Sequence, residues 1–147
     1  MVRGLLVGPG QVRGPAARRT VHALIAAGAV LLAWSGVIHL RLWSQGYQSI
    51  PVIGPLFLAQ GVGTLVIAAV LVAVRRLAVM AVGAVTLAAT SGGLLLSAHL
   101  RLFGYRESLA VPDVRTSLYV ECTGTAILLL AAGLTLGAAR GGGGAGR

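Results

Sequence analysis

Two short stretches place the same polar residues in an otherwise apolar chain. Residues 39–43 read His-Leu-Arg-Leu-Trp, and sixty positions later residues 99–103 read His-Leu-Arg-Leu-Phe. Each stretch is followed by a Gly-Tyr pair and then by a proline. This recurrence predicts an internal duplication, and it marks the positions where imidazole and guanidinium groups could take part in chemistry.

The similarity continues beyond the prolines, where Gln60 in the first copy corresponds to Glu121 in the second. Both lie about four residues inside an apolar run, and His39 and His99 each lie about four residues before an aromatic residue of the kind found at membrane interfaces. Four residues of helix rise about 6 Å, so we expect the four side chains to share one polar layer near the outer leaflet. A carboxylate at membrane depth is costly and marks a functional candidate.

Small residues precede each histidine at helical spacing, with Gly28 and Ser35 before His39 and Gly92 before His99. Stripes of small residues are typical of contacts between membrane helices. We therefore expect both imidazoles to point into a helical bundle rather than toward lipid.

Four interpretations of this layer remain open. The first is a hydrogen-bonded cluster that fixes helix packing. The second is a haem b held between His39 and His99, with its propionates near Arg41 and Arg101, since two imidazoles can supply both axial ligands. The third is a divalent metal bound by His39, His99 and Glu121, a ligand set that suits zinc or iron. The fourth is a small proton-coupled transporter in which Glu121 exchanges its proton.

The polar residues lie near the ends of long apolar runs. Hydrophobic residues make up 56% of the 147 residues and the mean hydropathy is +0.89, above the range of ordinary soluble domains. Each run is about as long as a bilayer core requires, and backbone amides in lipid must pair within their own segment. The sequence thus predicts four transmembrane helices, at residues 21–40, 56–74, 77–98 and 118–139.

The predicted fold class is all-α, a four-helix transmembrane bundle built from two parallel-repeat helical hairpins. Each copy contains two spans, so both copies enter the membrane in the same direction. We expect flexible cytoplasmic tails on either side of the helices. The predicted segments are a tail at 1–19, hairpins at about 20–74 and about 77–139, and a glycine-rich tail at 140–147.

The net charge of +9 comes entirely from arginine. These arginines cluster at the ends of the apolar runs, a pattern that indicates membrane topology rather than nucleic-acid binding. By the positive-inside rule, both termini face the cytoplasm and the protein lies in the cell inner membrane. Eight arginines fall on the cytoplasmic side (Arg3, Arg13, Arg18, Arg19, Arg75, Arg76, Arg140, Arg147) and four on the other (Arg41, Arg101, Arg106, Arg115).

Several further residues are expected to be structural. Cys122, the only cysteine, excludes an internal disulfide and is expected to be a buried thiol. Tyr47 and Tyr105 should anchor the loops at the membrane interface. Glycines are also expected to allow close helix packing (Gly28, Gly36, Gly61, Gly63, Gly92 and Gly93), and Gly133 and Gly137 have a spacing that suits helix packing or a homodimer. A charged segment in the second outer loop is expected to be solvated (Arg106, Glu107, Asp113 and Arg115).

Residues 50–58 read Ile-Pro-Val-Ile-Gly-Pro-Leu-Phe-Leu. Together with the His-Leu-x-Leu-Trp and Gly-Tyr motifs, this string resembles a pattern in small four-helix integral membrane proteins of bacteria. The resemblance covers chiefly residues 36–62, more loosely 96–125, and implies a fold without a particular activity. Because the chain has no glycine-rich nucleotide loop or hydrolase motif, we expect a small accessory or structural membrane component, with the lipid bilayer and a homodimer or larger membrane complex as partners.

Overall fold

The computed structural model describes residues 7–100 and 102–143. These residues form an all-α four-helix bundle, as the sequence predicts, and none of them belongs to a β-strand. The elements in chain order are η1 (Pro9–Gln11), α2 (Pro15–Ser44), η2 (Tyr47–Ser49), α3 (Ile53–Val74), α4 (Leu77–Leu100) and α5 (Pro112–Gly143).

Local sequence fixes where the helices begin and end. Pro15 and Pro112 open α2 and α5, positions where the missing amide hydrogen costs nothing and the fixed φ favours a helix. The α3–α4 turn is made by Arg75, which adopts a left-handed conformation with φ of 51°. The backbone reverses there, so α3 and α4 run antiparallel.

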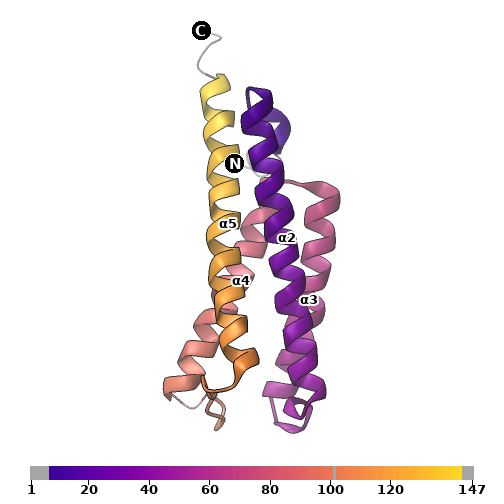
Figure 1. Ribbon diagram of the computed structural model, residues 1–147, viewed down its shortest axis with the longest axis vertical. Helices are drawn as coiled ribbons and strands as arrows, with labels where there is room; N and C mark the ends of the chain where they lie inside the picture. The colour runs from indigo at the N-terminus through magenta and orange to yellow at the C-terminus, as the bar shows by residue number, and fades with distance from the viewer. Residues whose placement is uncertain (1–6, 101, 144–147) are drawn as a thin grey trace.

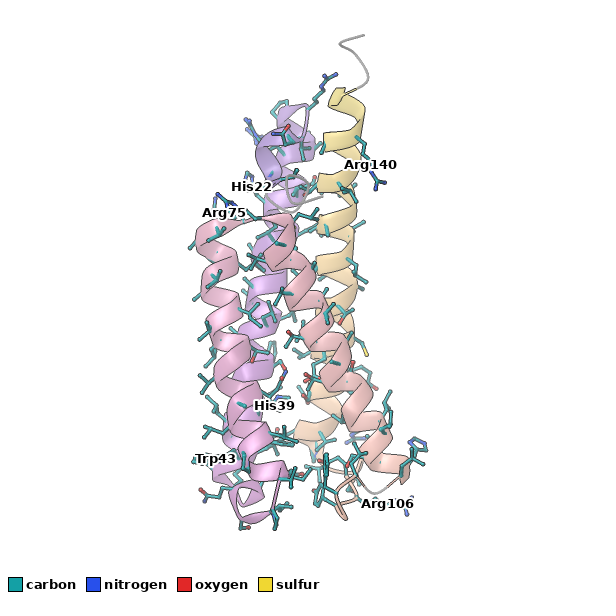
Figure 2. All side chains as sticks on the ribbon, turned by 180° about the vertical axis from the view of Figure 1, so that it is seen from behind. His22, His39, Trp43, Arg75, Arg106 and Arg140 are labelled. Atoms are coloured by element: carbon teal, nitrogen blue, oxygen red, sulfur yellow. The ribbon has the colours of Figure 1, made fainter. Side chains whose placement is uncertain are left out.

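The helices are arranged in a ring in the order α2, α3, α4, α5 (Figure 1). Packing is extensive between α2 and α3, α4 and α5, and α2 and α5, but it is sparse between α3 and α4. The two weakly packed helices meet near Arg75 and diverge toward the opposite end (Figure 2). This divergence creates the space in which the candidate site lies.

Small residues allow the closest helix contacts. A Cβ added to Gly36 of α2 would lie 2.8 Å from the carbonyl oxygen of Gly61 on α3, and one added to Gly28 would overlap Leu128 of α5. The expected packing role of these glycines is confirmed. Other glycines expected to pack face open space instead (Gly63, Gly92, Gly93, Gly133 and Gly137). The apolar core beside the contacts includes Leu32, Leu71, Met80, Leu87 and Leu128.

All four helices are longer than the predicted runs, α2 and α5 by the most. α2 spans Pro15–Ser44 where 21–40 was predicted, and α5 spans Pro112–Gly143 where 118–139 was predicted. Residues just before α2 also contact the bundle, since Val7 O accepts a hydrogen bond of 2.8 Å from Leu77 N and Val12 packs against the core. Helical hydrogen bonding therefore continues beyond the apolar runs, where hydropathy alone gives no signal.

All four α-helices are long and apolar enough to cross a membrane. Large apolar side chains on their outer faces are exposed, including Val30, Val66, Val85 and Leu129. A soluble protein rarely exposes such a continuous apolar surface, whereas the acyl chains of a bilayer would cover it. The chain is a polytopic membrane protein.

Candidate functional site

A fully buried carboxylate lies between α2 and α5. Glu121 of α5 is 0% exposed, and its Oε1 accepts hydrogen bonds from Ser35 Oγ of α2 at 2.9 Å and from Ser117 Oγ of α5 at 2.8 Å. Ser117 lies one helical turn before Glu121, on the same face of α5. Two hydroxyl groups thus hold one carboxylate oxygen in a defined position.

His39 faces this carboxylate from α2. The ring is buried at 4% exposure, and its Nδ1 lies 2.9 Å from the carbonyl oxygen of Ser35. Because a carbonyl can only accept, Nδ1 carries a proton and the other nitrogen, Nε2, faces Glu121. Nε2 lies 3.8 Å from Glu121 Oε1. A bare nitrogen beside a bare carboxylate is unfavourable in a low-dielectric interior, so this geometry favours one exchangeable proton held by the pair.

The second oxygen of Glu121 is unsatisfied. Oε2 is buried, and within the described parts of the chain it has no hydrogen-bond partner. Leaving such a group unpaired costs about 1–3 kcal/mol. Protonation of the carboxyl group would lower this cost, because a neutral carboxyl is cheaper to bury than a carboxylate.

A cavity of about 510 Å³ opens between α3 and α4 beside His39. Figure 2 shows His39 in the space between these two helices. Pockets that bind small molecules typically measure about 300–1,000 Å³. Leu56 and Val85, both exposed on the outer surface, belong to the wall, so the cavity opens toward the lipid-facing side. Its polar lining consists of His39, Gln60, Thr86, Thr90, Ser97, Tyr105, Glu107 and Ser117.

Gln60 crosses the gap between the weakly packed helices. Its Nε2 donates to Thr90 Oγ1 of α4, and the Thr90 hydroxyl donates to Thr86 O at 2.8 Å. Gln60 therefore lines the same cavity as His39, but the structure does not pair it with Glu121.

The end of the cavity far from the α3–α4 turn is closed by a second buried carboxylate. Glu107, in the α4–α5 loop, is 8% exposed, and its Oε1 accepts from Tyr47 Oη at 2.9 Å, Tyr105 Oη at 3.3 Å and Ser108 N at 3.0 Å. The expectation that Glu107 is solvated was wrong, because the loop folds over the cavity. Burial, together with the nearby carboxylate, raises the pKa of Tyr47 and of Tyr105, so both hydroxyls remain proton donors.

Aromatic rings form a continuous wall from His39 to this loop. The ring centroids of His39 and Phe57 are 5.1 Å apart, those of Phe57 and Tyr47 are stacked at 4.7 Å, and those of Tyr47 and Tyr105 meet edge-on at 5.8 Å. The tyrosines of the two Gly-Tyr motifs thus contact each other.

His99 does not join the site. It is exposed, and its Nδ1 lies 2.7 Å from the carbonyl oxygen of Leu95. The expectation that both imidazoles point inward was wrong for His99. Ser97, two residues earlier and about 200° around the helix, takes the inward face instead. Its Oγ donates to Tyr105 O at 3.4 Å, and its main-chain oxygen accepts from Glu107 N at 3.3 Å.

The exposed position of His99 affects both the haem and the metal interpretations. Within residues 7–100 and 102–143, no three His, Cys, Asp or Glu side chains come together in a group that could hold a metal ion. His39 and Glu121 are close, but His99 is not with them, so neither the three-ligand metal site nor a haem between the two imidazoles is assembled. Arg41 lies outside the cavity with its Nη2 3.9 Å from Asp113 Oδ2, and Arg101 lies outside the described residues.

Cys122 also differs from expectation. Its side chain is exposed on α5 rather than buried, because the inward face of this helix is taken by the neighbouring Glu121.

The residues missed from the sequence are Ser117, Glu107 and Thr90. Ser117 could have been found from its spacing, since it precedes Glu121 by one turn as Ser35 precedes His39. Glu107 and Thr90 gave no comparable signal, because both act across a loop or between helices. Comparison of the chain with protein-family models, with curated protein sequences and with solved structures found no match. The buried pair and its cavity are therefore the grounds on which a function is assigned.

Proposed function

We propose that the protein is a small accessory component of the cell inner membrane that binds a lipophilic small molecule in the cavity between α3 and α4. The observation that carries this proposal is a cavity of about 510 Å³ with a buried histidine in its wall. Its mostly apolar lining with a few convergent polar side chains is typical of sites that bind small molecules.

The arginine distribution supports an orientation for this site. Arg75 and Arg140 lie toward one end of the bundle, and Trp43 lies at the other (Figure 2). Since arginine-rich ends face the cytoplasm, both termini are cytoplasmic in this proposal and the cavity lies near the opposite leaflet.

Weak packing between α3 and α4 supports lateral access from the bilayer. The rim residues Leu56 and Val85 are 49% and 67% exposed. A molecule dissolved in the membrane would reach the cavity between these side chains without crossing water.

Two adjacent glycines of α4 offer a matched test. Gly93 lines the cavity and Gly92 does not, and a Cβ added at either position meets no atom within 4 Å. Gly93→Leu should fill the cavity without forcing the helices apart, whereas Gly92→Leu should leave it open. The measurement is saturable fluorescence of the neutral probe N-phenyl-1-naphthylamine with the protein in phosphatidylcholine nanodiscs.

We expect Gly93→Leu to weaken probe binding by about tenfold or more, a change of at least about 1.4 kcal/mol. Gly92→Leu should bind like the wild type, and the melting temperatures of both variants should show that they remain folded. Equal binding by wild type and Gly93→Leu, or no saturable binding by the wild type, would contradict the proposal.

A further inference from the structure

We infer that the ligand of this cavity is a lipophilic cation with hydrogen-bond donors, admitted in exchange for the proton held by His39 and Glu121. This inference rests on the proposed function and adds to it the chemical class of the ligand. It follows from the charge of the cavity, the direction of its hydrogen bonds and the nature of its wall.

The charged groups at the cavity are acidic. Glu107 belongs to the lining, and Glu121 lies directly behind His39 and Ser117. Among the described residues no arginine lines the cavity, and the chain has no lysine. Carboxylates in a low-dielectric site attract cations strongly and repel anions. A fatty acid or another anionic amphiphile is therefore a poor fit.

Four hydroxyl groups of the lining already donate to the protein, and the Thr86 hydroxyl is the exception among the described lining residues. Ser97 donates to Tyr105 O, Ser117 to Glu121 and Tyr105 to Glu107. Thr90 donates to Thr86 O, and one N–H of the Gln60 amide donates to Thr90.

Acceptor capacity remains on the same wall. Three hydrogen bonds converge on Oε1 of Glu107, and no described residue donates to its Oε2. His39 Nε2 carries a lone pair whenever the proton of the pair is elsewhere, because Nδ1 is committed to Ser35 O. A ligand that donates hydrogen bonds satisfies these atoms, whereas one that only accepts does not.

The aromatic wall favours the same class of ligand. Phe57 and Tyr105 line the cavity, and Tyr47 stacks on Phe57. The faces of aromatic rings attract cations, and this attraction grows when the cation is desolvated. The apolar part of the ligand would contact side chains such as Leu56 and Leu94.

Charge balance couples the cation to a proton. With its one proton the His39–Glu121 pair is neutral overall, and without it the pair carries one negative charge. Entry of one cation with release of one proton to solvent leaves the net charge of the site unchanged, and no bond other than the N–H or O–H bond is broken. The other titratable groups at the cavity are Glu107, Tyr47 and Tyr105, and the described residues of α3 and α4 contribute neutral Gln60, Thr86, Thr90 and Ser97.

Three fluorescent probes of different charge test the inference on the intact protein in phosphatidylcholine nanodiscs. Ethidium is an aromatic cation with amine donors, N-phenyl-1-naphthylamine is neutral, and 8-anilinonaphthalene-1-sulfonate is an anion. We expect ethidium to bind about tenfold or more tighter than the anion, as expected if one charge interaction contributes about 1.4 kcal/mol or more. In weakly buffered solution, ethidium binding should release protons.

Two conservative variants separate charge from shape. Glu121→Gln and Glu107→Gln keep an oxygen that can accept the existing hydroxyl hydrogen bonds, and each should weaken ethidium binding about tenfold while leaving the neutral probe unaffected. Proton release should disappear in Glu121→Gln but persist in Glu107→Gln. Should one variant fail to fold, as judged by its melting temperature, the other still tests the charge requirement.

The possible results test the cation inference and the ligand-binding function separately. If the neutral probe binds in a Gly93-dependent manner but ethidium does not, or the anion binds more tightly, the cation inference is wrong and the ligand-binding function stands. Ethidium binding without proton release overturns the exchange. Failure of all three probes to bind overturns both proposals.

Discussion

His39 and His99 occupy matching places in two similar stretches, and both rings bond the carbonyl oxygen four residues earlier, at 2.9 Å and 2.7 Å. Their surroundings differ completely. His39 lies one to two turns before the end of α2, a helix that packs against both α3 and α5, so its ring is buried against Glu121. His99 ends α4, which has diverged from α3, and its ring is exposed. The local bond follows from the helix itself, whereas burial depends on which neighbours remain in contact.

The largest expected effect contrasts these two histidines. His39→Ala leaves the buried Glu121 without its facing imidazole, and breaking a buried pair of this kind costs about 3 kcal/mol of unfolding free energy. His99→Ala changes an exposed side chain and should cost less than about 0.5 kcal/mol. Denaturant unfolding in detergent measures both. Equal losses of unfolding free energy in the two variants would show that burial of His39 does not contribute to stability.

A smaller contrast concerns the tyrosines that meet at Glu107. Tyr47→Phe removes a 2.9 Å hydrogen bond to a carboxylate and should cost about 2 kcal/mol, whereas Tyr105→Phe removes a longer one of 3.3 Å and should cost about 1 kcal/mol. Thermal unfolding at neutral pH measures which of the two variants loses more stability. A larger loss for Tyr105→Phe would indicate that Tyr105 is the main support of the loop.

The same tyrosines predict a pH dependence. Burial raises the pKa of both, so the folded state holds its protons at pH values where the unfolded chain releases them. Their contribution to stability is complete below about pH 10, the ordinary tyrosine value, and declines as the pH rises above it. The melting temperature of the wild type should fall over this range, and that of Tyr47→Phe should fall less steeply. Parallel curves for the two proteins would exclude Tyr47 as the source.

The smallest effect is expected outside the cavity. Arg41 and Asp113 are 3.9 Å apart, and the arginine side chain is 61% exposed. Exposed ion pairs contribute about 0–1 kcal/mol, so Arg41→Ala should barely change the melting temperature or probe binding. A large loss of binding in this variant would mean that the cavity extends to the helix ends.

Most of the fold could be predicted from sequence, because apolar runs of bilayer length leave the backbone one main solution. The runs at 21–40 and 118–139 lie inside α2 and α5. Their additional turns at the termini of the chain were not predictable from hydropathy, since Arg18, Arg19 and Arg140 continue the helices without an apolar signal.

The candidate site could be predicted only where one helix face determines it. The sequence placed Glu121 and His39 in one layer, and the structure brings them together. His99 and Glu107 were misjudged because both depend on the divergence of α4 from α3 and on the loop that follows. That divergence is a property of packing between distant segments, and no spacing along one helix encodes it.

The unequal helix lengths determine how the bundle can sit in a membrane. At 1.5 Å per residue, the 22 residues of α3 extend about 33 Å, close to the thickness of a hydrocarbon layer, whereas the 30 residues of α2 extend about 45 Å. The excess of α2 and α5 lies at the end that carries the termini (Figure 1). When α3 and α4 span the hydrocarbon layer, the extra residues of α2 and α5 extend about 12 Å beyond it.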